Sequence, residues 1–180
     1  ITYREAIREA LREEMLRDET VFLMGEDIGI FGGPFKVTKG LVEEFGPERV
    51  RDTPLSETGF MGAGVGAALT GMRPVVEVMY HDFLPSCMDQ IVNQAAKLTF
   101  LSGGQAKLPL VIRSPVGRGR SAGAQHSQNL LPLFMHIPGL EIAAPSTPYD
   151  AKGLLKTAIR GNSPVMFFEH MLLYRVNGPV

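Results

Sequence analysis

The chain has 180 residues, and 18 Lys and Arg face 19 Asp and Glu, so its formal net charge is −1. This charge argues against nucleic acid as the main partner, and no apolar run approaches the ~20 residues that a membrane helix needs. The single cysteine, Cys87, excludes an intrachain disulfide and metal sites built on paired cysteines. A lone thiol suits a reducing compartment. We therefore expect one globular domain that binds neither nucleic acid nor a membrane.

The first predicted element is an amphipathic helix. Thr2 and Glu5 have the spacing of a capping box, in which Thr2 bonds the backbone and Glu5 reaches back to it. Small and apolar residues follow at helical spacing and predict one buried stripe, formed by Ala6, Ile7, Ala10, Leu11 and Met15. Glutamates and arginines three or four apart predict ion pairs along a solvated face: Glu5 with Arg8, Glu9 with Arg12 and Glu13 with Arg17.

Short apolar runs and helical periods alternate along the rest of the chain. Strands are predicted at 21–24, 74–79, 108–112, 140–144 and 164–168, and helices at 41–45, 57–70, 86–101 and 150–159. The strands are continuous apolar runs, which is typical of strands covered on both faces. The alternation predicts an α/β fold, a doubly wound and mostly parallel sheet with helices on both faces.

In such sheets ligands bind beyond the carboxyl ends of the strands, here the loops 25–36, 52–57, 79–85, 114–128 and 145–149. Glu57 lies where a loop enters an apolar helix. It is either a charge that favours the helix start or a buried carboxyl group that exchanges a proton with a ligand nitrogen. His126 lies in a loop rich in glycine and serine. It either acts as an acid, a base or a hydrogen-bond donor, or it is an inert loop residue. The segment 79–83 combines aromatic, imidazole and carboxylate groups. It either contacts a ligand or forms the edge of the core.

Two further features favour structural roles. Gly62, Gly64 and Gly66 form G-x-G-x-G inside a predicted helix, which differs from the dinucleotide fingerprint in both spacing and position. Small residues there favour the close approach of another helix or subunit. Cys87 lies within a predicted helix and is expected to be buried.

Several motifs carry a resemblance to one family. They occur in the same order in it, at 52–57 (DTPLSE), 73–77 (RPVVE), 88–97 (MDQIVNQAAK), 123–128 (GAQHSQ) and 150–154 (DAKGL). The chain resembles the β subunit of the thiamine-diphosphate-dependent component of 2-oxo acid dehydrogenase complexes, over nearly all 180 residues. Segments 35–40 and 145–150 lean toward the pyruvate and acetoin branches. The resemblance implies that residues 1–180 form a transketolase-type pyrimidine-binding domain, and that the family's carboxy-terminal domain is absent from this chain.

The resemblance also implies roles for particular residues. Glu57 matches the glutamate that hydrogen-bonds N1′ of the cofactor's aminopyrimidine and activates it for ylid formation. His126 matches a histidine that acts at the reactive carbon or as the acyl group moves to a lipoyl arm. Phe83 matches the aromatic residue that packs on the pyrimidine ring, and Leu55 and Met79 match apolar wall positions.

Cofactors and partners follow from the same resemblance. The Gly-Asp-Gly signature for the diphosphate and Mg²⁺ does not occur in this sequence, and in the family it belongs to the α subunit. Potassium is expected on backbone carbonyls at Leu110, Ala158, Ile159, Gly161 and Ser163. The implied partners are the α subunit, a second β subunit in an α2β2 tetramer and a lipoyl acyltransferase core. The implied compartment is the cytoplasm of a bacterium or the mitochondrial matrix.

The resemblance favours a thiamine-diphosphate-dependent pyruvate or acetoin dehydrogenase that is active only with its α subunit. Two alternatives stay open. The chain could be the pyrimidine domain of a transketolase-like single-chain enzyme, or a non-catalytic assembly module that kept the fold. If a second domain normally follows, apolar surface at 166–174 is expected to be exposed.

Overall fold

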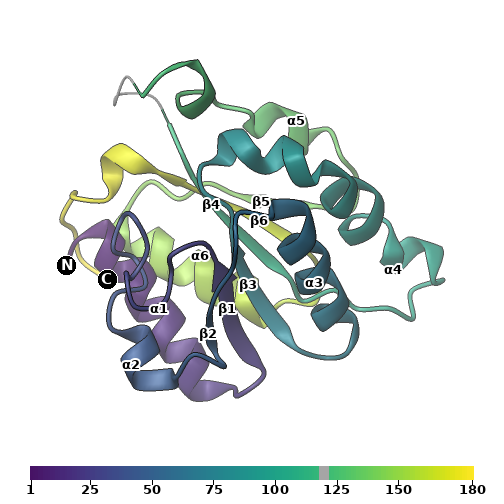
Figure 1. The fold of residues 1–180 in the computed structure, drawn as a ribbon, viewed down its shortest axis with the longest axis horizontal. Helices are drawn as coiled ribbons and strands as arrows, with labels where there is room; N and C mark the ends of the chain where they lie inside the picture. The colour runs from purple at the N-terminus through teal and green to yellow at the C-terminus, as the bar shows by residue number, and fades with distance from the viewer. Residues whose placement is uncertain (118–121) are drawn as a thin grey trace.

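A computed structural model describes residues 1–117 and 122–180. Within these ranges, six strands form one all-parallel sheet in the order β2-β1-β3-β4-β6-β5 (Figure 1). The strands are β1 (Val21–Gly25), β2 (Val50–Asp52), β3 (Arg73–Glu77), β4 (Val111–Val116), β5 (Glu141–Ala143) and β6 (Val165–His170). The expected doubly wound α/β fold is confirmed.

Helices cover both faces of the sheet and enclose two apolar cores (Figure 1). On one face lie α1 (Tyr3–Arg17), α2 (Leu41–Phe45) and α6 (Pro148–Arg160). On the other lie α3 (Glu57–Leu69), two irregular helical turns, α4 (Leu98–Leu101) and α5 (Leu131–Met135). No helix in the described ranges combines the length and the apolar character needed to cross a membrane.

The start and the buried stripe of α1 agree with the sequence. The Thr2 hydroxyl accepts from the Glu5 amide at 3.2 Å, and a Glu5 carboxylate oxygen accepts from the Thr2 amide at 2.8 Å, which completes the capping box. All five small and apolar residues of the predicted stripe are buried. Burial of this stripe against the sheet and α6 accounts for the helix, because isolated helices of this length are marginal in water.

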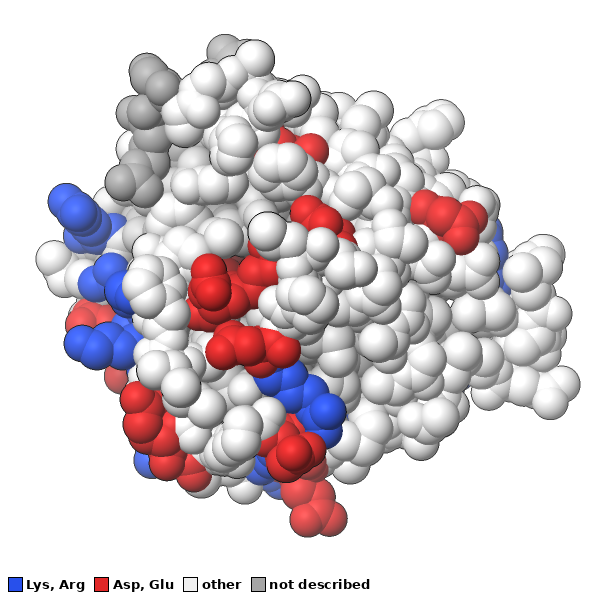
Figure 2. All heavy atoms as spheres, in the orientation of Figure 1, with Lys and Arg blue, Asp and Glu red and all other residues white. Residues whose placement is uncertain are grey.

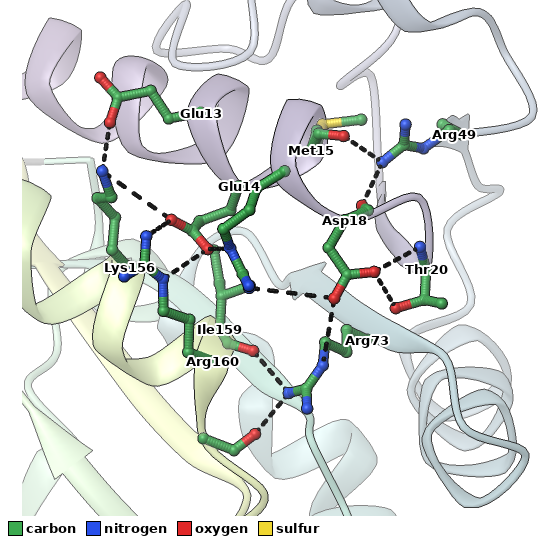
Figure 3. Close-up of polar contacts among 12 residues, drawn as sticks. Glu13, Glu14, Met15, Asp18, Thr20, Arg49, Arg73, Lys156, Ile159 and Arg160 are labelled. Atoms are coloured by element: carbon green, nitrogen blue, oxygen red, sulfur yellow. Dashed lines mark hydrogen bonds and ion pairs between the residues drawn. The ribbon is translucent and has the colours of Figure 1, made fainter.

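The predicted ion pairs along α1 were wrong. Three of its glutamates instead bind cations of α6, which lies alongside: Lys152 contacts Glu9 and Glu13, Lys156 contacts Glu13, and Arg160 contacts Glu14. Figure 3 shows the contacts of Lys156 and Arg160. Glu14 also pairs with Arg17 of α1 itself. The Arg8 guanidinium donates to backbone carbonyls of residues 36 and 37, and Arg12 pairs with Glu44. This face of α1 is therefore an interhelical contact, and Glu14 in it is fully buried.

The predicted helix at 86–101 is replaced by three short pieces. A 3₁₀ segment, η1 (His81–Cys87), is followed by a π-helical turn, η2 (Gln90–Ala95), and then by α4. Pro85 lies inside η1 and has no N–H to donate, which prevents a regular α-helix there. The early start of η1 brings residues 81–85 directly against the end of β3.

Three strand boundaries also differ. β3 ends at Glu77, and β4 begins at Val111 and continues to Val116 through Pro115, so the loop expected from 114 begins at 117. The short strand β2 was not predicted. The segment 166–174, expected to expose apolar surface, is largely buried: Met166, Phe167 and Phe168 are at most 1% exposed, and Tyr174 is 5% exposed. β6 lies between β4 and β5, with helices on both faces, so this domain covers it by itself.

Candidate active site

The candidate site lies at the carboxyl edge of the sheet. Gly25, Glu77 and Arg113 stand in register on β1, β3 and β4, so the segments that follow these strands leave the sheet together. Ligands of open parallel sheets bind at this edge. The structure brings the predicted residues at 55–57, 79–83 and 126 to this edge.

Glu57 is the first residue of α3 and is half-buried. Its charge contributes to the pKa of two buried groups, Cys87 and Glu26. Burial, and then the charge of Glu57, raise the pKa of Cys87 to about 12. Next to the start of α3, a cavity of about 680 Å³ is lined by Ser56, Gly59 and Phe60, among others. Leu55, a predicted wall residue, is 84% exposed beside it.

Glu26 is a site residue that the sequence analysis did not single out. It directly follows β1 and is only 7% exposed, and its Oε1 has no hydrogen-bond partner within the described ranges. Burial, followed by the charges of Glu57, Asp27 and Glu77, raises the pKa of Glu26 to about 7. A carboxyl group that can gain or lose a proton near neutral pH, Glu26, therefore lies within the electrostatic influence of Glu57. Figure 2 shows acidic side chains gathered over the middle of the face of Figure 1.

His126 is half-buried between two aromatic rings. Its ring centroid lies 5.2 Å from those of Tyr80 and Phe83, both packed edge-on. Met79 precedes this pair at the end of the β3 segment and is half-buried. The structure therefore brings His126 and Phe83, 43 positions apart in the sequence, into direct contact, and the aromatic segment 79–83 lies at the ligand edge and not only in the core.

Four of the five carbonyls predicted to bind potassium accept hydrogen bonds within the protein. The Arg73 guanidinium donates to the carbonyls of Ile159 and Gly161 at 2.9 and 2.6 Å (Figure 3). The Leu110 carbonyl accepts from the Val165 amide at 2.9 Å, and that of Ala158 accepts from the Gly161 amide at 3.2 Å. Ser163 lines a separate surface cavity. The positively charged Arg73 side chain thus already binds two of these carbonyls.

Outside residues 118–121, the chain contains no group of three or more His, Cys, Asp or Glu side chains placed to hold a metal ion.

Comparison with known proteins adds to this geometry. "Pyruvate dehydrogenase E1 component subunit beta" of Chaetosphaeridium globosum is 54% identical over 173 residues, covering 96% of this chain and 53% of the relative. The protein of that name from Rickettsia felis is 52% identical over 174 residues, covering 97% and 53%. The chloroplastic subunit beta-4 of Oryza sativa subsp. japonica is 57% identical over 172 residues, covering 96% and 43%. The chain thus spans about half the length of these relatives or less.

A solved structure and a family description agree with the fold. The structure titled "Split gene transketolase, inactive beta4 tetramer" aligns with a TM-score of 0.77 at 19% identity, covering 99% of this chain and 54% of that one. At this identity the likeness concerns the fold alone. The family described as "Transketolase, pyrimidine binding domain" matches residues 1–177. The resemblance seen in the sequence is therefore confirmed, and the chain belongs to the transketolase pyrimidine-binding domain family.

Proposed function

We propose that this chain is the pyrimidine-binding half of the β subunit of a thiamine-diphosphate-dependent pyruvate dehydrogenase. The observation that carries the proposal is the pair of carboxyl groups at the sheet edge, Glu57 at the start of α3 and the buried Glu26, whose pKa is raised to about 7. The names of relatives that are 52–57% identical support the same assignment. Activation of an aminopyrimidine requires a carboxyl group that holds a proton at a ring nitrogen.

The residues present fit the cofactor. When bound, thiamine diphosphate supplies the electron sink for cleavage next to a carbonyl group. Glu57 would hold a proton at N1′ of the aminopyrimidine. The buried Glu26, whose pKa is raised to about 7, would supply a second protonatable group at this edge. The unpartnered Oε1 of Glu26 is free for proton exchange among the described residues. Phe83, Leu55 and Met79 would form the apolar surroundings of the pyrimidine ring.

His126 would act at the substrate. A histidine can donate or accept a proton near neutral pH, and this one is half-buried against Tyr80 and Phe83. We propose that it stabilises the developing charge on the substrate oxygen or assists the transfer of the acyl group to a lipoyl carrier.

The remaining components belong to the proposed assembly. The α subunit would hold the diphosphate and Mg²⁺, a second β subunit would complete an α2β2 tetramer, and a lipoyl acyltransferase core would receive the acyl group. A potassium ion would bind lone pairs of the carbonyls that the resemblance implies, those of Leu110, Ala158, Ile159, Gly161 and Ser163. Acetoin is the alternative substrate, and we propose a bacterial cytoplasm or an organelle matrix as the compartment.

The test uses the full-length β chain co-expressed with its α partner. Reduction of an artificial electron acceptor is followed with thiamine diphosphate, Mg²⁺ and pyruvate, with acetoin and a branched-chain 2-oxo acid in parallel. We expect turnover with pyruvate that disappears when either chain is omitted. Glu57→Gln should lower it by about 100-fold or more. The control Glu48→Gln, whose side chain is 86% exposed, should not change it.

Other results would favour the alternatives. An unchanged rate in Glu57→Gln would indicate a non-catalytic assembly module. Turnover by the β polypeptide without any α chain would indicate a transketolase-like single-chain enzyme. Turnover with acetoin and not pyruvate would change the substrate and keep the mechanism.

A further inference from the structure

His81 and Asp82 contact the segment that follows His126. His81 is fully buried at the start of η1, and its Nε2 lies 2.8 Å from the carbonyl oxygen of Gln128 and 3.2 Å from the amide nitrogen of Leu130. One neutral tautomer donates to Gln128 and the other accepts from Leu130. Either tautomer ties the imidazole to the backbone two to four residues beyond His126.

Asp82 completes this attachment. Its Oδ1 accepts a hydrogen bond from the amide of Gln128 at 3.0 Å. The backbone carbonyl and amide of Gln128 are thus held by two consecutive side chains, although residues 128–130 belong to no strand or helix. The attachment crosses 46 or 47 positions of sequence, so it fixes this loop to the start of η1.

The residues on either side of the pair act on His126 itself. Tyr80 and Phe83 hold the His126 ring edge-on at 5.2 Å. Residues 80–83 therefore supply two ring contacts to His126 and two polar contacts to Gln128. The backbone after His126 is held, and two rings pack against its side chain. The His126 imidazole therefore has little freedom to move.

We propose that His81 and Asp82 are positioning residues that fix the segment 126–130 and thereby place the His126 imidazole at the substrate. The inference rests on the proposed function, in which His126 touches the substrate. Catalytic groups must be held to about 0.5 Å, and a displacement of about 1 Å can cost on the order of 100-fold in rate.

His81 itself does not reach the substrate. Its ring is fully buried and packs edge-on against Phe168 at 6.0 Å. Burial lowers the pKa of His81, against smaller opposing effects of the Gln128 carbonyl and the Asp82 charge, so the ring stays neutral at physiological pH. It acts as a fixed anchor in the interior.

The experiment uses the assembled holoenzyme with pyruvate. His81→Phe keeps a buried ring and removes the bond to residues 128–130, and Asp82→Ala removes the acceptor for the Gln128 amide. We expect kcat to fall about 10- to 100-fold in each, with the KM for thiamine diphosphate changed by less than about 2-fold. Asp82→Asn keeps an oxygen in place and should recover at least about half of the activity.

A double-variant cycle separates positioning from general damage. If His81 and Asp82 act through His126, adding His81→Phe or Asp82→Ala to His126→Ala should cost less than about 2-fold more, since coupled residues are non-additive. Hydrogen–deuterium exchange of a peptide covering 122–130 should rise in His81→Phe and Asp82→Ala, but not in Asp82→Asn. If His81→Phe does not assemble, the Asp82 variants carry the test alone.

Different results would contradict the positioning role of His81 and Asp82 and the proposed role of His126. Full additivity with His126→Ala, or unchanged exchange in Asp82→Ala, overturns the positioning role and leaves the proposed function intact. Loss of activity in His126→Ala without loss in His81→Phe and Asp82→Ala does the same. Full activity in His126→Ala overturns the proposed role of His126, and with it this inference, while Glu57→Gln still tests the cofactor chemistry.

Discussion

Arg113 binds Glu169 through two parallel hydrogen bonds, from Nε to Oε1 at 2.6 Å and from Nη2 to Oε2 at 2.8 Å. The third nitrogen of the guanidinium binds Glu77 at 2.6 Å, and all three side chains are buried. One cation on β4 therefore joins the adjacent strands β3 and β6 directly behind the candidate site. Tyr174 adds a hydrogen bond to Glu169 at 2.8 Å.

Arg113→Met should lower the free energy of unfolding by about 3–5 kcal/mol, because it leaves two carboxylates buried without their cation. Urea unfolding followed by circular dichroism measures this change. Arg51→Met, at a side chain that is 49% exposed, is the control and should cost less than about 1 kcal/mol. A loss below about 1 kcal/mol in Arg113→Met would show that Glu77 and Glu169 are stable without the guanidinium.

Glu26 should make the domain less stable as the pH rises through neutrality. Its pKa of about 7 in the folded chain lies above the ordinary value of 4.5, so its contribution is complete below pH 4.5 and is lost as the pH passes 7. The difference amounts to roughly 2–3 kcal/mol between pH 5 and 8. Glu26→Gln should flatten this part of the stability profile, as measured by urea unfolding at intervals of pH. Parallel profiles for the two proteins would contradict the assignment.

Two glycines of α3 should respond to alanine in opposite directions. A Cβ at Gly64 would lie 2.7 Å from Cγ2 of Val76 on β3, whereas a Cβ at Gly66 would meet nothing within 4 Å. Gly64→Ala should destabilise the chain by about 1–3 kcal/mol through overpacking. Gly66→Ala should stabilise it by about 0.5–1 kcal/mol through helix propensity. Thermal unfolding of the 180-residue chain distinguishes the two, and equal effects would refute the packing argument.

Potassium should raise the Tm of the domain specifically. The Arg73 guanidinium donates to the carbonyls of Ile159 and Gly161, and each carbonyl keeps a second lone pair for a cation. Replacing NaCl with KCl at equal ionic strength should therefore raise Tm, because an ion that binds only the folded chain stabilises it. A shift of less than about 1 °C, which corresponds to only a few tenths of a kcal/mol for a domain of this size, would contradict the proposed potassium site.

The sequence was informative where a local pattern carries the physics. The capping box at Thr2 and the apolar stripe of α1 were predicted correctly, and the continuous apolar runs placed most strands of a two-sided parallel sheet. The sequence was misleading where residues distant in sequence determine the local structure or the ion-pair partners. Pro115 lies inside a central strand, where proline is rare, so β4 was predicted to end too early. The partners that Glu9, Glu13 and Glu14 have on α6 lie 139–146 positions away in the sequence.

The candidate site shows the same division. Glu57, Phe83 and His126 were found because they follow strands whose carboxyl ends meet, and because the motifs around them resemble a family. Glu26 was not found, since a carboxylate after an apolar strand has the same pattern whether it ends exposed or buried. The contact of His81 with Gln128 arises only once the chain is folded, because no short-range pattern links residues 47 apart.

The two ends of the domain are held by a small antiparallel pairing. Ile1 and Gly178 exchange backbone hydrogen bonds at 3.0 Å each, and the Tyr3 amide donates to the Val176 carbonyl at 2.8 Å. Residues 1 and 178 lie at the same end of this pairing, so a force that separates the two segments there loads these bonds one after another. Such unzipping needs little force, and tension would release the first turn of α1 from residues 176–178 well before it reached the parallel sheet.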